Sequence, residues 1–205
     1  MKDVGLDLRV IRTKESIKNA LIELLEEKGF ESITVKDITT RAKINRGTFY
    51  SHYLDKYDLM AKCAEDLVKE MENKILKNIP KIIADLETNT PNTIPLPFLV
   101  PFIEFLNQNR GFMKAMLGPN GDITFQSKLK MFMRKALFDS NKNTVFKRED
   151  LLVPPEYLVS YIASAHIGVI QEWLNSDRDE SPQEIARIIS TMTINGPFFA
   201  AGFKK

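Results

Sequence analysis

The chain of 205 residues has little of several things, and each shortage excludes a class of protein. Its single cysteine, Cys63, excludes an internal disulfide. Without any zinc-binding spacing around it, one cysteine is typical of a reducing compartment. Cys63 lies in an expected helix, which favours a small packing residue, and the alternative is a redox-sensitive thiol.

Long hydrophobic runs are also missing. The first ten residues contain no apolar core of the kind that a signal peptide has. The most apolar stretch, residues 94–103, is about ten residues long and is interrupted by three prolines, so it is too short to span a bilayer. We therefore expect a cytoplasmic protein with no membrane partner.

Catalytic and metal-binding patterns are scarce. The two histidines, His52 and His166, lie far apart in the chain and form no metal pair. The sequence contains no glycine-rich phosphate loop, no nucleophile elbow and no HExxH motif. It therefore predicts no catalytic residue, no metal and no cofactor, and it argues against an enzyme.

Charge of one sign is not abundant overall, since the net charge is +2. Locally the balance differs, because residues 36–56 contain five basic side chains against the two acids Asp37 and Asp55. The basic residues are Lys36, Arg41, Lys43, Arg46 and Lys56. A solvated surface and a DNA-binding surface both explain this bias, and the surrounding helices decide between them.

Residues 34–56 predict two short helices joined by a tight turn. Thr34 suits the N-cap of the first helix, and Asp37 three positions later supplies the acid of a capping box. Residues 43–45 form the turn, where Ile44 can fill the angle between the helices. Two short helices joined by about 3–4 residues form a helix-turn-helix, whose second helix enters the major groove of DNA.

The second helix of this pair is expected to begin after Asn45, its cap, and to end at Tyr53. Phe49 and Tyr53 are spaced i and i+4 and therefore face the core. The polar residues of the helix are left on its outward faces: Arg46, Thr48, Tyr50, Ser51 and His52.

Here the sequence resembles the TetR family of bacterial transcriptional regulators, over about residues 9–71. The matching features are Gly29-Phe30, Thr34-Val35, Asp37-Ile38, Ala42 with Ile44, Arg46-Gly47-Thr48-Phe49-Tyr50, His52-Tyr53, and Lys56 with Leu59. One position departs from the family, which often has glycine after the alanine of the turn, where this chain has Lys43. A side chain with a Cβ disfavours positive φ, so we expect a slightly different turn.

The resemblance implies roles in DNA binding. Arg46 would donate two hydrogen bonds to a base edge, ideally guanine, and Gly47 would allow close approach to the groove wall. Other residues are expected to contact bases or the phosphate backbone: Thr34, Lys36, Thr48, Tyr50, Ser51, His52 and Lys56. The alternative for each is a solvated polar face. Arg9 and Arg12 on the first helix, expected over residues 8–27, are left open as phosphate contacts.

The chain as a whole is expected to be all-α. No proline occurs before Pro80, so the helix-turn-helix and a long helix over residues 55–78 are uninterrupted. We expect a three-helix DNA-binding domain over residues 1–54. A C-terminal helical bundle over residues 55–205, which binds an effector and dimerises, is linked to it by the long helix.

The expected bundle is rich in phenylalanine and methionine, which can line an apolar ligand cavity or form an ordinary helical core. The resemblance favours a cavity for a small apolar effector. The candidates for its lining are Phe98, Phe102, Phe105, Met113, Met116, Phe125, Phe132, Met133 and Tyr161.

The helix expected over residues 156–175 is apolar nearly all round, so one side can pack in its own subunit and the other on a partner. The last helix is expected to begin at a capping box formed by Ser181 and Glu184. Together, these two helices look similar to the four-helix dimer interface of TetR-like proteins. The similarity is greatest to a branch of the family found in low-GC Gram-positive bacteria. Interface candidates are Val159, Ala163, His166, Ile167, Ile170, Leu174, Ile185, Ile188, Ile189 and Met192.

Two of these expectations have alternatives. The two apolar helices can instead form a wholly intramolecular core. His166 is expected to be a hydrogen-bonded core or interface histidine, with pH or ligand sensing as the alternative.

The function that the resemblance implies is sequence-specific regulation of transcription, as a homodimeric repressor that binds a palindromic operator in double-stranded DNA and responds to a small effector. A second hypothesis is an activator whose C-terminal domain binds a partner protein. A third, from another class, is a helical small-molecule carrier or enzyme.

Overall fold

The computed structural model describes residues 4–76, 99–118, 123–138, 148–176 and 178–202. These residues form helices joined by turns, and no strand occurs among them, which confirms the predicted all-α class. The chain divides into two units, Met1–Leu67 and Val68–Lys205. The division falls inside the helix expected over residues 55–78, whereas the sequence placed the domain boundary before that helix.

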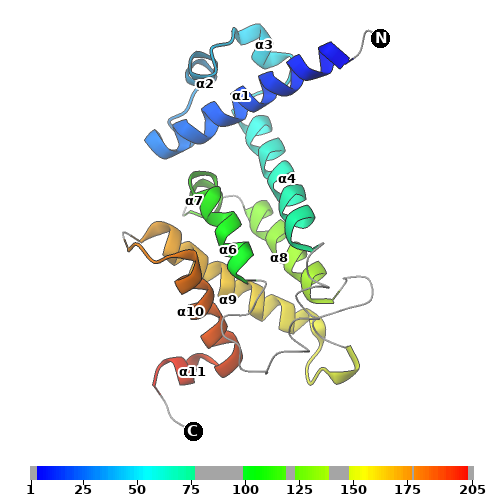
Figure 1. Ribbon diagram of the computed structural model, residues 1–205, viewed down its shortest axis with the longest axis vertical. Coiled ribbons are helices and arrows are strands. Elements are labelled where there is room, and N and C mark those ends of the chain that lie inside the picture. Colours follow the sequence, from blue (N-terminus) through cyan, green and yellow to red (C-terminus); the bar gives the residue numbers. More distant parts are fainter. Residues whose placement is uncertain (1–3, 77–98, 119–122, 139–147, 177, 203–205) are drawn as a thin grey trace. The chain divides into compact units, whose positions relative to one another are not determined.

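The first unit contains α1 (Val4–Lys28), α2 (Val35–Arg41), α3 (Arg46–Tyr50) and the first part of α4 (Lys56–Ile75) (Figure 1). α1 packs against α2, and α2 packs against α3. The side chains that recur at helical spacing form its buried core: Ile17, Leu21, Leu24, Ile38, Phe49, Tyr53 and Leu59. Three helices around one core thus position α3.

Local signals set the beginnings of α2 and α3. The Thr34 hydroxyl accepts a hydrogen bond from the Asp37 N–H at 3.2 Å, and the Asp37 carboxylate accepts one from the Thr34 N–H at 2.8 Å. The Asn45 side chain accepts from the Thr48 N–H at 2.7 Å. Both predicted caps are confirmed, and α3 ends at Tyr50 rather than at Tyr53.

The turn between α2 and α3 takes the left-handed conformation that the sequence disfavours. Lys43 has φ 55° and is the one residue other than glycine with positive φ in the described part of the chain. Its N–H donates to the Thr40 carbonyl at 3.2 Å, and the Ile44 N–H donates to the Thr39 carbonyl at 3.0 Å. These two bonds are those of a Schellman motif, so the turn that glycine usually makes is kept with lysine.

The second unit is a helical bundle in which α10 packs on α6 and α9 packs on α7, α8 and α10 (Figure 1). Its elements are α6 (Leu99–Gln108), α7 (Arg110–Leu117), α8 (Ile123–Phe138), the 3-10 turn η2 (Arg148–Asp150), α9 (Pro155–Asn175), α10 (Pro182–Asn195) and α11 (Pro197–Ala200). The predicted capping box of Ser181 and Glu184 begins α10, which confirms it.

Aromatic pairs bring the helices of this bundle together. Phe102 of α6 stacks on Phe132 of α8 with ring centroids 5.9 Å apart, and Phe112 of α7 meets Phe125 of α8 edge to face at 6.3 Å. Such pairs stabilise a core slightly beyond the burial of their area. Within the described ranges, no helix is long and apolar enough to cross a bilayer.

Candidate nucleic-acid interface

α3 has one buried side and one exposed polar side. Phe49 is completely buried, whereas Arg46 and Ser51 are exposed and Tyr50 keeps 49% of its surface accessible. The rings of Tyr50 and Phe49 form a T-shaped pair, with their centroids 5.5 Å apart. Gly47 is exposed as well, and the remaining predicted contacts of this segment, Thr48 and His52, are half-buried. The structure therefore places all six predicted residues of the segment on or beside one short helix.

Gly47 has a task that the sequence did not reveal. A Cβ built on Gly47 would come 3.3 Å from Oδ1 of Asn45. That oxygen accepts hydrogen bonds from the N–H and the hydroxyl of Thr48, at 2.7 and 3.0 Å. Glycine therefore leaves room for the cap of α3, and the Thr48 hydroxyl is already used as a donor inside the protein.

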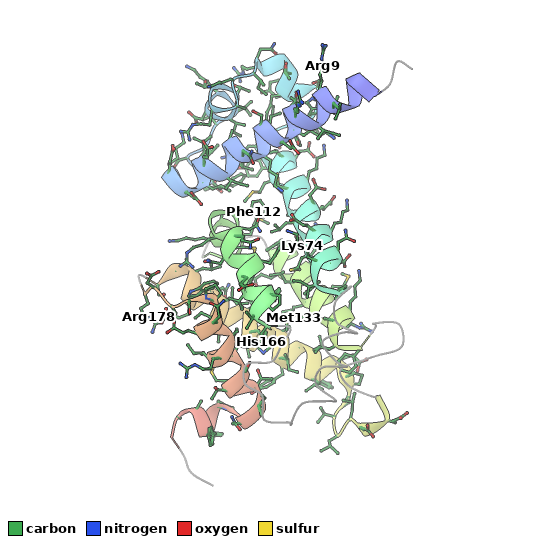
Figure 2. The ribbon with its side chains drawn as sticks, in the orientation of Figure 1. Arg9, Lys74, Phe112, Met133, His166 and Arg178 are labelled. Carbon is green, nitrogen blue, oxygen red and sulfur yellow. The ribbon has the colours of Figure 1, made fainter. Side chains whose placement is uncertain are left out.

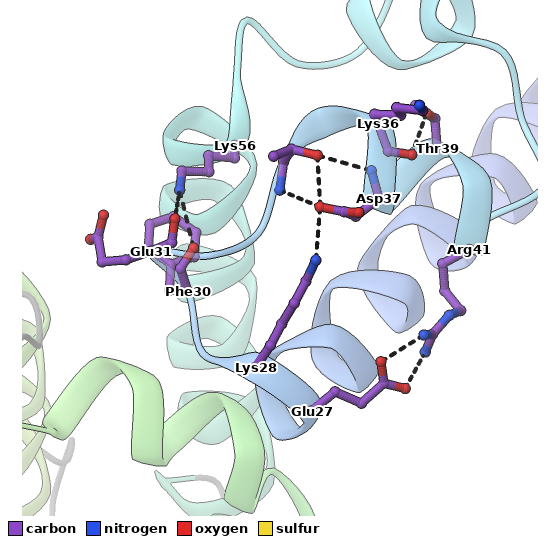
Figure 3. A network of polar contacts seen from close by, with 10 residues as sticks. Glu27, Lys28, Phe30, Glu31, Lys36, Asp37, Thr39, Arg41 and Lys56 are labelled. Carbon is purple, nitrogen blue, oxygen red and sulfur yellow. Dashed lines mark hydrogen bonds and ion pairs between the residues drawn. The ribbon is translucent and has the colours of Figure 1, made fainter.

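The cations of the helix-turn-helix fall into two groups. Lys36, Lys43 and Arg46 are exposed and have no ion-pair partner among the described residues. Arg41, in contrast, donates to both carboxylate oxygens of Glu27 at 2.7 Å (Figure 3). It also donates to Glu23 at 3.0 Å. These bonds hold the pKa of Glu27 below its ordinary value. Arg41 therefore fastens α2 to α1 and adds little to the basic surface.

Lys43 is a candidate contact that the sequence reasoning missed. It lies exposed in the turn directly before α3, and its charge was counted in the local excess without being assigned a role. Its position in the turn, next to Ile44 and Asn45, was the signal that could have identified it. Lys36 lies exposed on α2, as predicted.

Lys56 has partners within the protein (Figure 3). Its ammonium donates to the carbonyl oxygens of Phe30 and Glu31, at 3.1 and 3.0 Å. It also lies over the rings of Phe30 and Tyr57, 4.8 and 5.2 Å from their centroids. An ammonium group has three donors, so one remains for a phosphate. Lys56 thus stabilises the loop after α1, and its contact with DNA stays a prediction.

Thr34 is also engaged, because its hydroxyl donates to the Asp37 carboxylate at 2.6 Å (Figure 3). The same carboxylate pairs with Lys28 of α1 at 2.9 Å. Thr34 first and Lys28 second hold the pKa of Asp37 well below its usual range. This network fixes the start of α2 on α1, and the contact of Thr34 with phosphate stays a prediction.

On α1, Arg9 and Arg12 are exposed, and Arg9 is labelled in Figure 2. Neither has an ion pair with another described residue. Their contact with phosphate remains open.

The candidates for an effector cavity are distributed differently from what was expected. Six of them are buried in the interior of the second unit: Phe102, Phe105, Met113, Met116, Phe125 and Phe132. Met133 is half-buried, and Phe98 lies outside the described residues. Tyr161 is 64% exposed and does not face the interior, which corrects its assignment to a cavity.

The expected dimer face of α9 needs correction. Most of the side chains assigned to a partner are buried inside the subunit's own bundle, so they are not available to a second copy: Val159, Ala163, His166, Ile167, Ile170, Leu174, Ile185 and Ile189. Among the candidates, Ile188 is 37% exposed and Met192 is half-buried. The exposed face of α9 contains Tyr157, at 74%, and Tyr161.

Cys63 is a packing residue and His166 is a hydrogen-bonded histidine, rather than a redox-sensitive thiol and a pH sensor. Cys63 is buried, and burial raises the pKa of its thiol to about 11, as expected of a packing residue. His166 has Nε2 2.9 Å from the Thr193 hydroxyl, and burial lowers its pKa to about 4 (Figure 2). It is therefore a neutral, hydrogen-bonded histidine of the bundle. In the described part of the chain, no cluster of three or more side chains suits a metal ion.

Comparison with protein families gives two matches that do not overlap. A family described as "Bacterial regulatory proteins, tetR family" matches residues 17–63, which contain the helix-turn-helix. A second, described as "Transcriptional regulator C-terminal region", matches residues 95–195.

Curated relatives occur in Bacillus subtilis (strain 168). The uncharacterized HTH-type transcriptional regulator YxbF is 24% identical over 192 residues, which cover 89% of this chain. The chain spans about half the length of the curated relatives it matches, 45% of YxbF and 55% of the uncharacterized regulator YerO.

Solved structures share the fold. A TetR transcriptional regulator from Streptococcus agalactiae 2603V is 24% identical with a TM-score of 0.62, and the match covers 92% of this chain and 97% of that one. The dihydroxyacetone kinase operon activator DhaS is 20% identical with a TM-score of 0.57, over 91% of this chain and 97% of that one. Both similarities extend over the two units.

Proposed function

Since the chain belongs to the TetR family of bacterial transcriptional regulators, we propose that it binds a palindromic operator as a homodimer and represses transcription until a small effector binds. The observation that carries this proposal is the exposed polar side of α3. Arg46, Tyr50 and Ser51 are exposed there, whereas Phe49 is buried, and the Asn45 cap fixes the start of the helix. A short, exposed second helix of this kind enters the major groove.

The contacts divide by chemistry. Arg46, whose side chain has no partner among the described residues, is the candidate for reading guanine, because its planar group donates two parallel hydrogen bonds. Lys36 and Lys43 offer point charges to phosphate, which position the protein without reading sequence. Tyr50 donates its phenol to phosphate. Ser51 and His52 flank these groups as base or backbone contacts.

Dimerisation is supported by the exposed apolar residues of α9 and α10. Tyr157 and Tyr161 lie one turn apart on α9, and Ala165 and Gly168 continue the same exposed face. Ile188 adds an exposed aliphatic side chain on α10. Apolar residues exposed together on a subunit favour association with another copy. A dimer related by a two-fold axis presents two α3 helices to two half-sites about 34–36 Å apart.

Response to an effector is proposed from the composition of the second unit's interior. The interior of the second unit contains several phenylalanines and methionines among its aliphatic residues, and methionine adapts to ligands of irregular shape. An effector would act by preferring one of two states that differ in affinity for DNA. α4 belongs to both units by sequence, so it is the segment through which such a preference would be transmitted.

Two other functions are weighed against repression. DhaS is named as an operon activator and has the same fold, so the fold is compatible with an activator whose second unit binds a partner protein. Repressor and activator differ in the effect on transcription and not in the use of α3. A carrier or enzyme would leave the exposed Arg46 and Tyr50 without a role.

The experiment is a gel shift with the DNA upstream of the protein's own gene and with random DNA. Arg46→Ala should weaken binding to the upstream DNA by about 1–3 kcal/mol and relax sequence preference. Arg178→Ala removes the same charge from the second unit and should leave both affinities unchanged. Affinities of Arg46→Ala that match the parent's on both DNAs would contradict the role of α3.

The same assay at several salt concentrations separates contacts with phosphate, which position the protein, from contacts with bases, which read the sequence. Lys36→Ala should weaken binding to both DNAs alike and reduce the slope of log affinity against log salt by about 1. A loss confined to the upstream DNA would instead assign Lys36 to a base edge.

A further inference from the structure

A hollow of about 320 Å³ lies in the second unit between α8 and α9, which pack against each other. α8 contributes Lys130, Met131 and Arg134 to its lining, and α9 contributes Val159 and Ser160. None of the phenylalanines and methionines expected to line an effector cavity borders it. It is thus a different place in the fold from the interior discussed above.

The inner wall of the hollow is apolar and firmly packed. Phe138 and Val159 border it and are 7% and 8% exposed. Both belong to a buried cluster with Leu137, against which Leu158 and Ile162 pack. A wall of this kind offers fixed apolar surface to a ligand and does not depend on the ligand to fold.

The rim of the hollow is positively charged. Lys130 and Arg134 are spaced i and i+4 on α8, so both side chains lie on the same face of the helix. Neither has an ion-pair or hydrogen-bond partner in the parts of the chain that the structure describes. By contrast, the neighbouring Lys135 pairs with Glu72 at 2.6 Å. The rim contains one acid, Glu156, so its side chains carry one net positive charge.

We propose that this hollow binds a small amphipathic anion, a carboxylate with a short apolar chain. The carboxylate accepts hydrogen bonds from Arg134 and Lys130, since a guanidinium matches the two oxygens of a carboxylate. The chain lies against Phe138 and Val159. The volume is at the lower end of the range for ligand pockets, roughly 300–1,000 Å³, which favours a small ligand. This proposal goes beyond the DNA-binding function and does not rest on it.

The test is calorimetric titration of the full chain with octanoate, and with octan-1-ol as the neutral molecule of the same length. Octanoate should bind and octan-1-ol should bind about tenfold more weakly, because the alcohol has no charge for Arg134. Arg134→Gln should weaken octanoate by about the same factor, whereas Lys114→Gln, which removes an exposed lysine of α7, should not.

A second variant tests the space in the hollow without changing its charged residues. Ser160→Phe places a large side chain in the space from the exposed side of α9 and should abolish octanoate binding without unfolding the bundle, as circular dichroism would verify. Absence of octanoate binding to the parent, equal binding of octan-1-ol, or unchanged binding by Arg134→Gln and Ser160→Phe would each overturn the proposal. Octanoate binding should persist in Arg46→Ala, so failure of the DNA-binding role and failure of this site are distinguishable.

Discussion

α3 and α9 differ in what holds them and in what they expose. α3 has five residues and contributes Phe49 to the core, so its stability depends on the Asn45 cap and on packing rather than on its length. α9 has 21 residues and a long buried face. Outside, α3 exposes a cation and hydroxyl groups, whereas α9 exposes tyrosines, serines, alanine and glycine, with Glu156 and Glu172 near its ends.

The difference indicates two kinds of partner for one chain. An exposed polar helix end with unpaired cations suits a charged, hydrated surface such as DNA. A helix face with exposed tyrosines among small side chains suits the surface of another protein subunit. α3 is too short to be stable by itself, and it is also the helix whose position matters most for reading the DNA sequence. The following variants test these two roles of α3 and α9.

The largest effect is expected from the residue that anchors α3. Phe49→Ala should destabilise the first unit by about 3–5 kcal/mol, because a completely buried ring is replaced by a cavity. Operator binding should be lost with it. Hydrogen exchange of the α3 amides measures the change locally.

Tyr50→Ala is the control for Phe49→Ala, because the Tyr50 ring lies next to Phe49 in the chain and is half exposed. It should weaken DNA binding and leave the exchange of the α3 amides nearly unchanged. Equal loss of protection in both variants would show that α3 is not held by the side that faces inward.

The next effect concerns the exposed face of α9. Tyr161→Glu should dissociate the proposed dimer in sedimentation, because an unpaired charge would be buried at a cost of roughly 3–5 kcal/mol. Ile123→Glu changes an exposed aliphatic residue of α8 and should leave the mass unchanged. A Tyr161→Glu protein with the parent's mass would move the interface elsewhere.

A smaller effect compares the two capping boxes. Thr34→Ala and Ser181→Ala should each destabilise their helix by about 0.5–2 kcal/mol, measured by exchange of the Asp37 and Glu184 amides. Thr34 and Lys28 lower the pKa of Asp37, and the Ser181 N–H and hydroxyl lower the pKa of Glu184.

Both carboxyl groups therefore stabilise the fold above their unfolded pKa values, near 4, and this stabilisation is lost as the pH falls below them. Thr34→Ala should reduce the acid sensitivity of α2, and Ser181→Ala that of α10. Acid sensitivity of α2 that is unchanged in Thr34→Ala would contradict the bonds assigned to Asp37.

The smallest effect is expected at the turn. Lys43→Gly should stabilise the first unit by up to about 1 kcal/mol, because it removes the Cβ that the left-handed conformation disfavours. The gain is reduced because glycine has more conformational entropy in the unfolded chain. Lys43→Ala keeps the Cβ and should give no such gain. Thermal unfolding that ranks alanine above glycine would show that Lys43 is not strained.

Helices and caps could be predicted from the sequence because their causes are local. The bounds of α9, Pro155–Asn175, agree with the expected 156–175, and Thr34, Asn45 and Ser181 cap the helices they precede. The polar side of α3 could also be predicted, because the buried pair of Phe49 and Tyr53 leaves only one orientation.

The orientation of α9 could not be predicted, because both of its faces are apolar. The sequence assigns Val159 to the dimer interface and Tyr161 to the cavity, yet the first is 8% exposed and the second 64%. The partners of the positively charged side chains could not be predicted from the sequence either. Arg41 pairs with Glu27, and Lys56 bonds to Phe30, across stretches of chain that no helical spacing connects.

The central claim is that the polar side of α3 lies in the major groove. Cys63 is buried with a raised pKa, so a cysteine introduced at Ser51 can be labelled selectively with a photo-crosslinker. On DNA upstream of the gene, we predict cross-links from Ser51→Cys at two positions about 10 base pairs apart, and none from Ser127→Cys on α8. Cross-linking of Ser51→Cys no stronger than that of Ser127→Cys would contradict the account.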